Sequence, residues 1–270
     1  MAVAGVWAVM SVAGAAQVEA QGWTGPYVGA TVGGGFQRAN ASETVRFDTN
    51  LDGSFGDTIR TVAGANAFAP GFCGGLAVNA TAAAGCARDE KGIDFGGRLG
   101  YDWQIGRMVV GALADVSRTD VTDSVTAFSI TPAFYSFSRQ LNYVGGLRGR
   151  VGFGSDRVLV YGTGGGAWGN VEQRFTTSNA VNTFVRTGDS ASAWGFQAGG
   201  GIEFKLGDHW SLAGEYLFTS LDDREESTIR TMGPAPATNP FILVNAAGTD
   251  LQRSGKFEFQ AARVGLSFRF

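Results

Sequence analysis

The 270-residue chain lacks the residues on which most catalytic and metal sites depend. It contains one histidine, His209, and two cysteines. A single histidine excludes metal sites built on two histidines, and its place beside a predicted short turn leaves no Ser-His-Asp arrangement on the loop side. Two thiols without a nearby histidine or second pair do not complete a tetrahedral zinc shell. The sequence therefore predicts no catalytic residue, no metal and no cofactor, and hence a protein that is not an enzyme.

Charge is also scarce. Charged residues make up 17% of the chain, below the roughly 25% of soluble proteins, and the formal net charge is −3. The basic residues do not gather into runs, so no nucleic-acid partner is predicted. No window reaches about 18 uninterrupted apolar residues, which excludes a membrane-spanning helix. A crossing of the bilayer would have to use strands.

The N-terminus has two possible interpretations. Residues 2–16 form a small-residue apolar stretch, and Val18-Glu19-Ala20 follows it. This pattern fits the cleavage rule of a secretory signal peptide, although the usual basic region is missing. We expect a signal peptide at residues 1–20 and a mature domain at residues 21–270; the alternative is a short helix of the mature protein. In an exported chain, Cys73 and Cys86 are expected to pair and to stabilise a loop by about 3 kcal/mol.

The sequence does contain segments in which apolar and polar side chains alternate. The last residues, 262–270 (ARVGLSFRF), put an apolar side chain at every second position. Successive side chains of a strand point to opposite faces, so this segment predicts a strand with one apolar and one polar face. About eight such segments occur along the chain, as in a small membrane barrel. They are separated alternately by short turns, near residues 105–107, 154–156 and 206–208, and by long connections, near residues 38–91, 120–138, 176–192 and 222–255.

Alternation alone leaves the orientation of the faces open. In a soluble sandwich the apolar faces point inward, whereas in a membrane barrel they point outward. The aromatic residues favour the barrel, because Trp103, Phe153, Phe204 and Trp210 lie beside the short turns, as in an interfacial girdle. We therefore predict an all-β, membrane-spanning, antiparallel up-and-down barrel of about eight strands, with short periplasmic turns and long extracellular loops. Alternating stretches within 41–62 and 226–246 leave a fifth pair of strands open.

The polar faces of these segments carry charges of both signs. A barrel of about eight strands is only wide enough to be filled by side chains, and an isolated charge inside it would be strongly unfavourable. We expect a salt-bridged plug; the alternative is the lining of an ion-selective channel. In the fourth segment the predicted outer face holds Leu141, Tyr143, Leu147, Val151 and Phe153. The predicted lumen network comprises Arg98, Asp102, Asp115, Arg148, Arg150, Glu203, Glu215, Arg263 and Arg269.

Three motifs carry a family resemblance. Residues 22–29 (GWTGPYVG), 100–104 (GYDWQ) and 265–270 (GLSFRF) resemble the first strand, the second strand and the C-terminus of small bacterial outer-membrane β-barrel proteins of the opacity/porin-like family. The resemblance covers most predicted strands but little of the loops. It departs at Leu113, where members commonly place an acidic residue.

The resemblance implies a location in the bacterial outer membrane, in contact with its lipid. It also implies that the barrel assembly machinery recognises the terminal strand through Leu266, Phe268 and Phe270. The function implied is a structural role in the envelope with surface display. Two alternatives keep the same barrel: a small-solute porin, or a receptor that binds a ligand through its loops. A third alternative, outside the membrane, is a soluble or periplasmic all-β binding domain.

Overall fold

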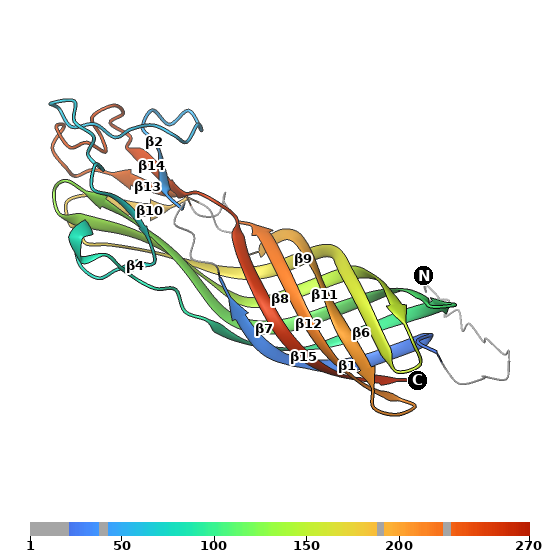
Figure 1. Cartoon of the computed structure of the whole chain (residues 1–270). Helices are drawn as coiled ribbons and strands as arrows, with labels where there is room; N and C mark the ends of the chain where they lie inside the picture. The colour runs from blue at the N-terminus through green and yellow to red at the C-terminus, as the bar shows by residue number, and fades with distance from the viewer. Residues whose placement is uncertain (1–21, 38–42, 188–191, 224–227) are drawn as a thin grey trace, which may run out of the picture.

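The computed structural model describes residues 22–37, 43–187, 192–223 and 228–270; the predicted signal peptide lies outside this part. Within the described residues, eight strands close into an antiparallel ring in which the first strand pairs with the last. Figure 1 shows the ring with its C-terminus and short turns at one end, here called the turn end. The strands are β1 (Gly25–Phe36), β6 (Gly92–Ile105), β7 (Met108–Ser129), β8 (Ala133–Gly154), β9 (Val158–Thr177), β11 (Ser192–Lys205), β12 (Trp210–Asp222) and β15 (Phe257–Arg269).

The ring turns its apolar faces outward and its charged faces inward. Leu99 is 61% exposed on the outside, whereas Arg148 is 2% exposed in the lumen. This orientation excludes the soluble sandwich, in which the aromatic faces would be buried. Over the described residues, no helix has the length and apolar character needed to cross a membrane.

A bulge in β8 changes which side chains face the lumen. The pairing of β8 with β9 shifts register between Leu141 and Tyr143, which leaves Asn142 as an extra residue. An extra residue in one strand reverses the alternation beyond it. Tyr143 accordingly points outward, while Leu141 is fully buried in the lumen. The prediction that Leu141 lies on the outer face is therefore wrong.

Three strands of the ring continue well beyond it. β7 and β8 remain paired up to a turn at residues 130–132, and β9 follows β8 along the same extension. The prediction of a loop at 120–138 is thus wrong for most of its length, because the alternation of side chains persists there with hydroxyl-bearing residues on one face. We call the part of the molecule above the ring the head; it is built from residues 43–91, 120–139, 171–187 and 228–256.

A second, four-stranded sheet completes the head. Its strand order is β10 (Thr183–Arg186), β13 (Ile229–Met232), β14 (Thr249–Arg253) and β2 (Val45–Asp48). The alternating stretches of the long connections therefore form a separate sheet instead of a fifth pair in the wall. An apolar core joins it to the extended hairpin, with Phe68 packing against Phe47 and Tyr135 at ring-centroid distances of 4.6 and 5.2 Å.

A segment closed by a disulfide covers the outside of the extended hairpin. Cys73 and Cys86 are bonded, which confirms the predicted pair. The Thr126 hydroxyl of β7 donates to the carbonyl oxygen of Gly75 at 2.8 Å, so the covering segment also satisfies polar groups of the hairpin. The segment consists of β3 (Gly71–Gly74), which pairs with β7, the hairpin of β4 (Leu76–Ala77) and β5 (Cys86–Ala87), and the 3-10 turn η1 (Ala82–Ala84).

Candidate functional site: the layered lumen

An apolar floor closes the turn end of the lumen. Trp23, just before β1, is fully buried and packs with Val109, Leu159 and Tyr161. Its indole Nε1 donates to the carbonyl oxygen of Ser155 at 2.8 Å, which fixes the ring across the barrel. Sequence reasoning included Trp23 only as part of a family motif, and the structure gives it a position that the alternation of the strands could not predict.

Above the floor lies a layer of ion pairs, here called the lower charge layer. Arg150 is one of its centres: Nε donates to Asp102 at 3.1 Å and Nη1 donates to Glu203 at 2.7 Å. The guanidinium also lies 5.1 Å from the ring centre of Tyr27 and 4.7 Å from that of Tyr161. Such contacts compensate a buried cation for the loss of water.

A second centre of this layer surrounds Asp115. Its carboxylate lies 2.8 Å from a nitrogen of Arg148 and 3.1 Å from a nitrogen of Arg263, which in turn lies 2.7 Å from Asp94. The predicted lumen network omits Asp94, although the alternation of side chains places Asp94 on the same polar face as Arg98. All nine residues predicted for the lumen lie in this layer.

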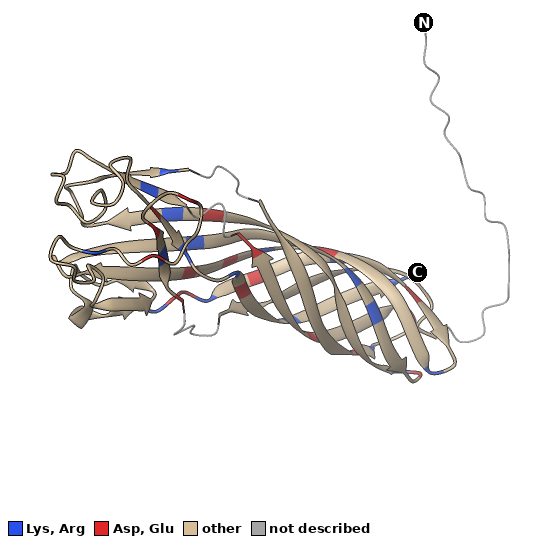
Figure 2. Ribbon diagram, turned by 90° about the horizontal axis from the view of Figure 1, so that it is seen from above, with Lys and Arg blue, Asp and Glu red and all other residues tan. Residues whose placement is uncertain are grey.

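Among the described residues, the lower charge layer contains as many arginines as carboxylates, so its formal charge is zero. Figure 2 shows positions of both signs along the ring. The members are Arg98, Arg148, Arg150, Arg263 and Arg269, with Asp94, Asp102, Asp115, Glu203 and Glu215.

An apolar layer follows, farther from the turn end. On β15, Phe257 and Phe259 precede Arg263 on the same inward face and are at most 1% exposed. The displaced Leu141 belongs to the same cluster. Side chains from β7, β8, β9, β11, β12 and β15 meet here: Val121, Leu141, Val144, Ala167, Val171, Ala193, Leu221, Phe257, Phe259 and Ala261.

A second set of ion pairs, the upper charge layer, lies between the apolar layer and the core of the head. Arg139 pairs with Asp123 at 2.7 Å and with Asp223 at 2.5 Å, while Arg253 pairs with Asp123 at 2.7 Å and with Glu43 at 2.6 Å. Sequence reasoning missed this layer because it assigned Asp123 to a loop. The signal was available, since Asp123 and Arg139 face each other across β7 and β8.

One carboxyl beside the upper charge layer has a strongly shifted pKa. Burial of Asp89, in the segment before β6, raises its pKa to about 7, and the nearby carboxylates of Asp123 and Glu43 act in the same direction. A hydrogen bond with Ser124 and the charge of Arg253 oppose the shift. Asp89 is therefore poised to change its protonation near neutral pH.

The outer face of the ring carries the aromatic residues singled out in the sequence. Trp103, Phe153, Phe204 and Trp210 are 52%, 74%, 46% and 49% exposed and lie next to the turns of the turn end. The side chains of the predicted assembly signal also lie on the outside, with Leu266 43% and Phe270 61% exposed and Phe268 partly covered. The anchoring and assembly roles of these residues stay predictions.

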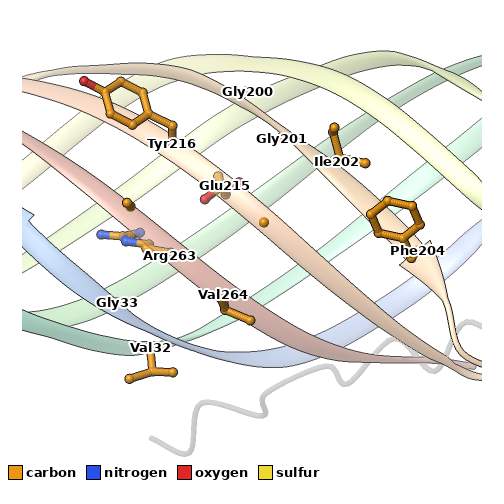
Figure 3. Close-up of a pocket in the computed structure, with 12 residues that line it drawn as sticks. Val32, Gly33, Gly200, Gly201, Ile202, Phe204, Glu215, Tyr216, Arg263 and Val264 are labelled. Atoms are coloured by element: carbon orange, nitrogen blue, oxygen red, sulfur yellow. The ribbon is translucent and has the colours of Figure 1, made fainter.

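A shallow hollow of about 590 Å³ marks the outer wall where β1, β15, β12 and β11 meet (Figure 3). Gly200, Gly214 and Ala262 supply little side-chain volume there, while Tyr216 and Val264 stand beside them. The lumen charges behind this part of the wall stay buried, as the lower charge layer requires. Glu215 and Arg263 are among the residues that line the hollow, but they are only 5% and 3% exposed, so the hollow is a shallow depression of the outer surface.

The arrangement holds charges of opposite sign together in buried pairs. Within the described ranges, no group of three or more His, Cys, Asp or Glu side chains is placed to hold a metal ion. The Nδ1 atom of His209 lies 2.9 Å from the carbonyl oxygen of Arg269 at the turn end, away from the head. The lumen carboxylates face arginines, so their charge is neutralised in place.

Comparisons with known proteins agree with this architecture. A family model described as outer membrane protein beta-barrel domain matches residues 5–270. The 31 kDa outer-membrane immunogenic protein of Brucella melitensis is 27% identical over 261 residues, which are 95% of this chain and 87% of that protein. The 22 kDa outer membrane protein of Rhizobium leguminosarum is 27% identical over 139 residues, 51% of this chain and 57% of that protein. The crystal structure of OprG from Pseudomonas aeruginosa is similar in fold, with a TM-score of 0.50 and 12% identity over 93% of this chain and all of that one.

Proposed function

The chain belongs to the outer membrane protein beta-barrel family and lies in the bacterial outer membrane, and on this basis we propose that it is a closed, non-enzymatic barrel that contributes to envelope structure and displays its head at the cell surface. The exposed apolar faces of the ring contact outer-membrane lipid in this proposal. The assembly machinery recognises the terminal strand through Leu266, Phe268 and Phe270.

The observation that carries the proposal is the alternation of charged and apolar layers along the lumen. An ion that moved along the barrel would have to leave the lower charge layer and enter an apolar layer whose side chains are at most 3% exposed. Transfer of a charge into such surroundings is strongly unfavourable. The paired carboxylates also argue against acid or base catalysis, because an arginine holds each charge in a fixed pair.

The head supports the display part of the proposal. It has its own core and a disulfide, as expected of a folded unit outside the membrane. The Brucella relatives are named immunogenic proteins, which is consistent with a part of the molecule that antibodies reach. A small-solute porin on the same wall is less well supported, because the apolar layer lies in the path. A loop-based receptor is the second candidate, and a pocket in the head favours it.

Planar-bilayer recordings test the closed lumen. We expect the wild-type protein to give no conductance steps, because the apolar layer excludes ions. The triple variant Trp23→Ala/Phe257→Ala/Phe259→Ala removes the indole of the floor and two of the largest side chains of the apolar layer, and it is expected to conduct. The variant Phe196→Ala, in which the residue lost is 49% exposed on the outer face, is the matched control and should stay silent.

Steady conductance by the wild-type protein would overturn the closed barrel and favour the porin. Heat-modifiable migration on gels shows that each variant has folded, so a silent unfolded sample is recognised as such. Surface biotinylation of intact cells tests display independently of conductance. A head that is protected in intact cells and labelled only after lysis would contradict the display role.

A further inference from the structure

A pocket of about 370 Å³ opens in the head, at the end of the molecule opposite the turn end. Four segments that are far apart in sequence form it: residues 61–68, the turn and strand start at 129–135, residues 178–181 and residues 239–241. Volumes of 300–1,000 Å³ are typical of small-molecule sites. The pocket is separate from the layered lumen, whose ion pairs contribute no lining residue.

The floor of the pocket is aromatic. Phe68, Tyr135 and Phe241 pack against one another with ring centroids 5.2 to 5.8 Å apart, and each is at most 4% exposed. Ile130 and Val181 stand at the rim and are 46% and 56% exposed. Water over an aromatic floor is poorly bound, so an apolar molecule that displaces this water gains free energy.

The polar side chains that line the pocket are all neutral hydroxyls and amides. The Asn179 side-chain amide donates to the Tyr135 hydroxyl at 2.9 Å, and the Ser129 hydroxyl donates to the Thr131 carbonyl at 2.6 Å. The described residues that line the pocket include no Asp, Glu, Lys, Arg or His. A charged ligand would lose its hydration there without gaining a partner, so the lining selects a neutral molecule.

We propose that this pocket binds a neutral small molecule with an aromatic or aliphatic body and one hydroxyl-sized polar group. The body packs on the aromatic floor, and the polar group meets the side of the pocket where Ser129, Tyr135 and Asn179 gather. The inference rests on the receptor candidate for the head, and it names the chemical class of the ligand.

Calorimetry on the full chain in lipid nanodiscs tests the proposal, with empty nanodiscs as the background. The probes are 1-naphthol, its anionic analogue 1-naphthoate, and maltose as a neutral polar molecule. We expect 1-naphthol to bind above the background and at least about tenfold more tightly than either other probe. Ala180→Trp, at an exposed lining position, should weaken 1-naphthol binding by about tenfold or more because the indole occupies the mouth.

Ala83→Trp is the matched control, because it adds the same indole to an exposed position of η1 that does not line the pocket. Its affinity for 1-naphthol should stay within about twofold of the wild type. Equal binding by the wild type and Ala180→Trp would overturn the proposal, as would a preference for 1-naphthoate or maltose. Binding that persists while the head is found to be hidden in intact cells would contradict the display role but not the pocket.

Discussion

The lower charge layer of the ring and the core of the head bury opposite kinds of side chain, although β7 and β8 contribute to both. On the inward face of β7, Asp115 joins the lower charge layer, whereas Val125 joins the core of the head. On the outward face, Val116 is 53% exposed in the ring, whereas Thr126 is fully covered in the head. The surrounding medium accounts for the reversal, since hydrocarbon favours apolar side chains outside the ring and water drives them inside the head.

The comparison shows that the inward-facing side chains of one strand can change from charged to apolar within a few residues. The change occurs at the apolar layer, where β7 and β8 also shift register. Below this layer the interior is held by the ion pairs of the lower charge layer, and above it first by the upper charge layer and then by the apolar core of the head. Loss of one side chain should therefore have different consequences in the two regions.

The largest effect is expected for Arg150→Ala in the ring. The substitution leaves the carboxylates of Asp102 and Glu203 buried without this partner, and breaking a buried ion pair in this way costs about 3–5 kcal/mol. Urea unfolding in lipid vesicles measures the loss in free energy of unfolding. Arg107→Ala, at an exposed turn residue, is the control and should change it by less than about 0.5 kcal/mol. Similar values for the two variants would show that the lower charge layer does not stabilise the ring.

A matched pair of substitutions tests whether the outer face of the ring contacts hydrocarbon while the outer face of the head contacts water. Leu147, near the middle of the ring, is 69% exposed, and Leu243, in a loop of the head, is 38% exposed. Leu147→Arg should lower the free energy of unfolding by about 2–4 kcal/mol, because the arginine would face hydrocarbon. Leu243→Arg should change it by less than about 0.5 kcal/mol, because that side chain faces water. If both variants unfold alike in vesicles, the ring is not surrounded by lipid.

The smallest effect concerns pH and is confined to the junction between ring and head. The pKa of Asp89 is raised in the folded protein to about 7, above its ordinary value of 3.8, so the folded state binds the proton more tightly than the unfolded state does. Its contribution to stability is complete below pH 4 and is lost as the pH rises through about 7. Limited proteolysis of the head should therefore be faster at pH 8 than at pH 5 once corrected for protease activity. Asp89→Asn should abolish the difference; a difference that persists in this variant would assign it to other groups.

The ring could be predicted well from the sequence because alternation is a local signal. The positions of the strands, their outward faces and the Cys73–Cys86 pair follow from residues that are close together in the chain. The alternation of side chains along each strand also selects the residues that meet in the lower charge layer. Leu141 was misplaced because a bulge depends on how β8 pairs with β9. The upper charge layer was missed because Asp123 was assigned to a loop, and because its partners Glu43 and Arg253 come near it only in the folded head.

The pairing of β1 with β15 has a consequence for the order of events during folding. Arg269 donates through Nη1 to the carbonyl oxygen of Gly25 at 3.1 Å, although the two residues are 244 positions apart. Local hairpins can form while much of the polypeptide is still disordered. The pairing of β1 with β15 can form only after both strands have come together. Contacts between such distant positions are slow to form. We therefore expect the pairing of β1 with β15 to be the last and slowest step in barrel formation. Before this step, the open sheet exposes the unpaired edges of both strands.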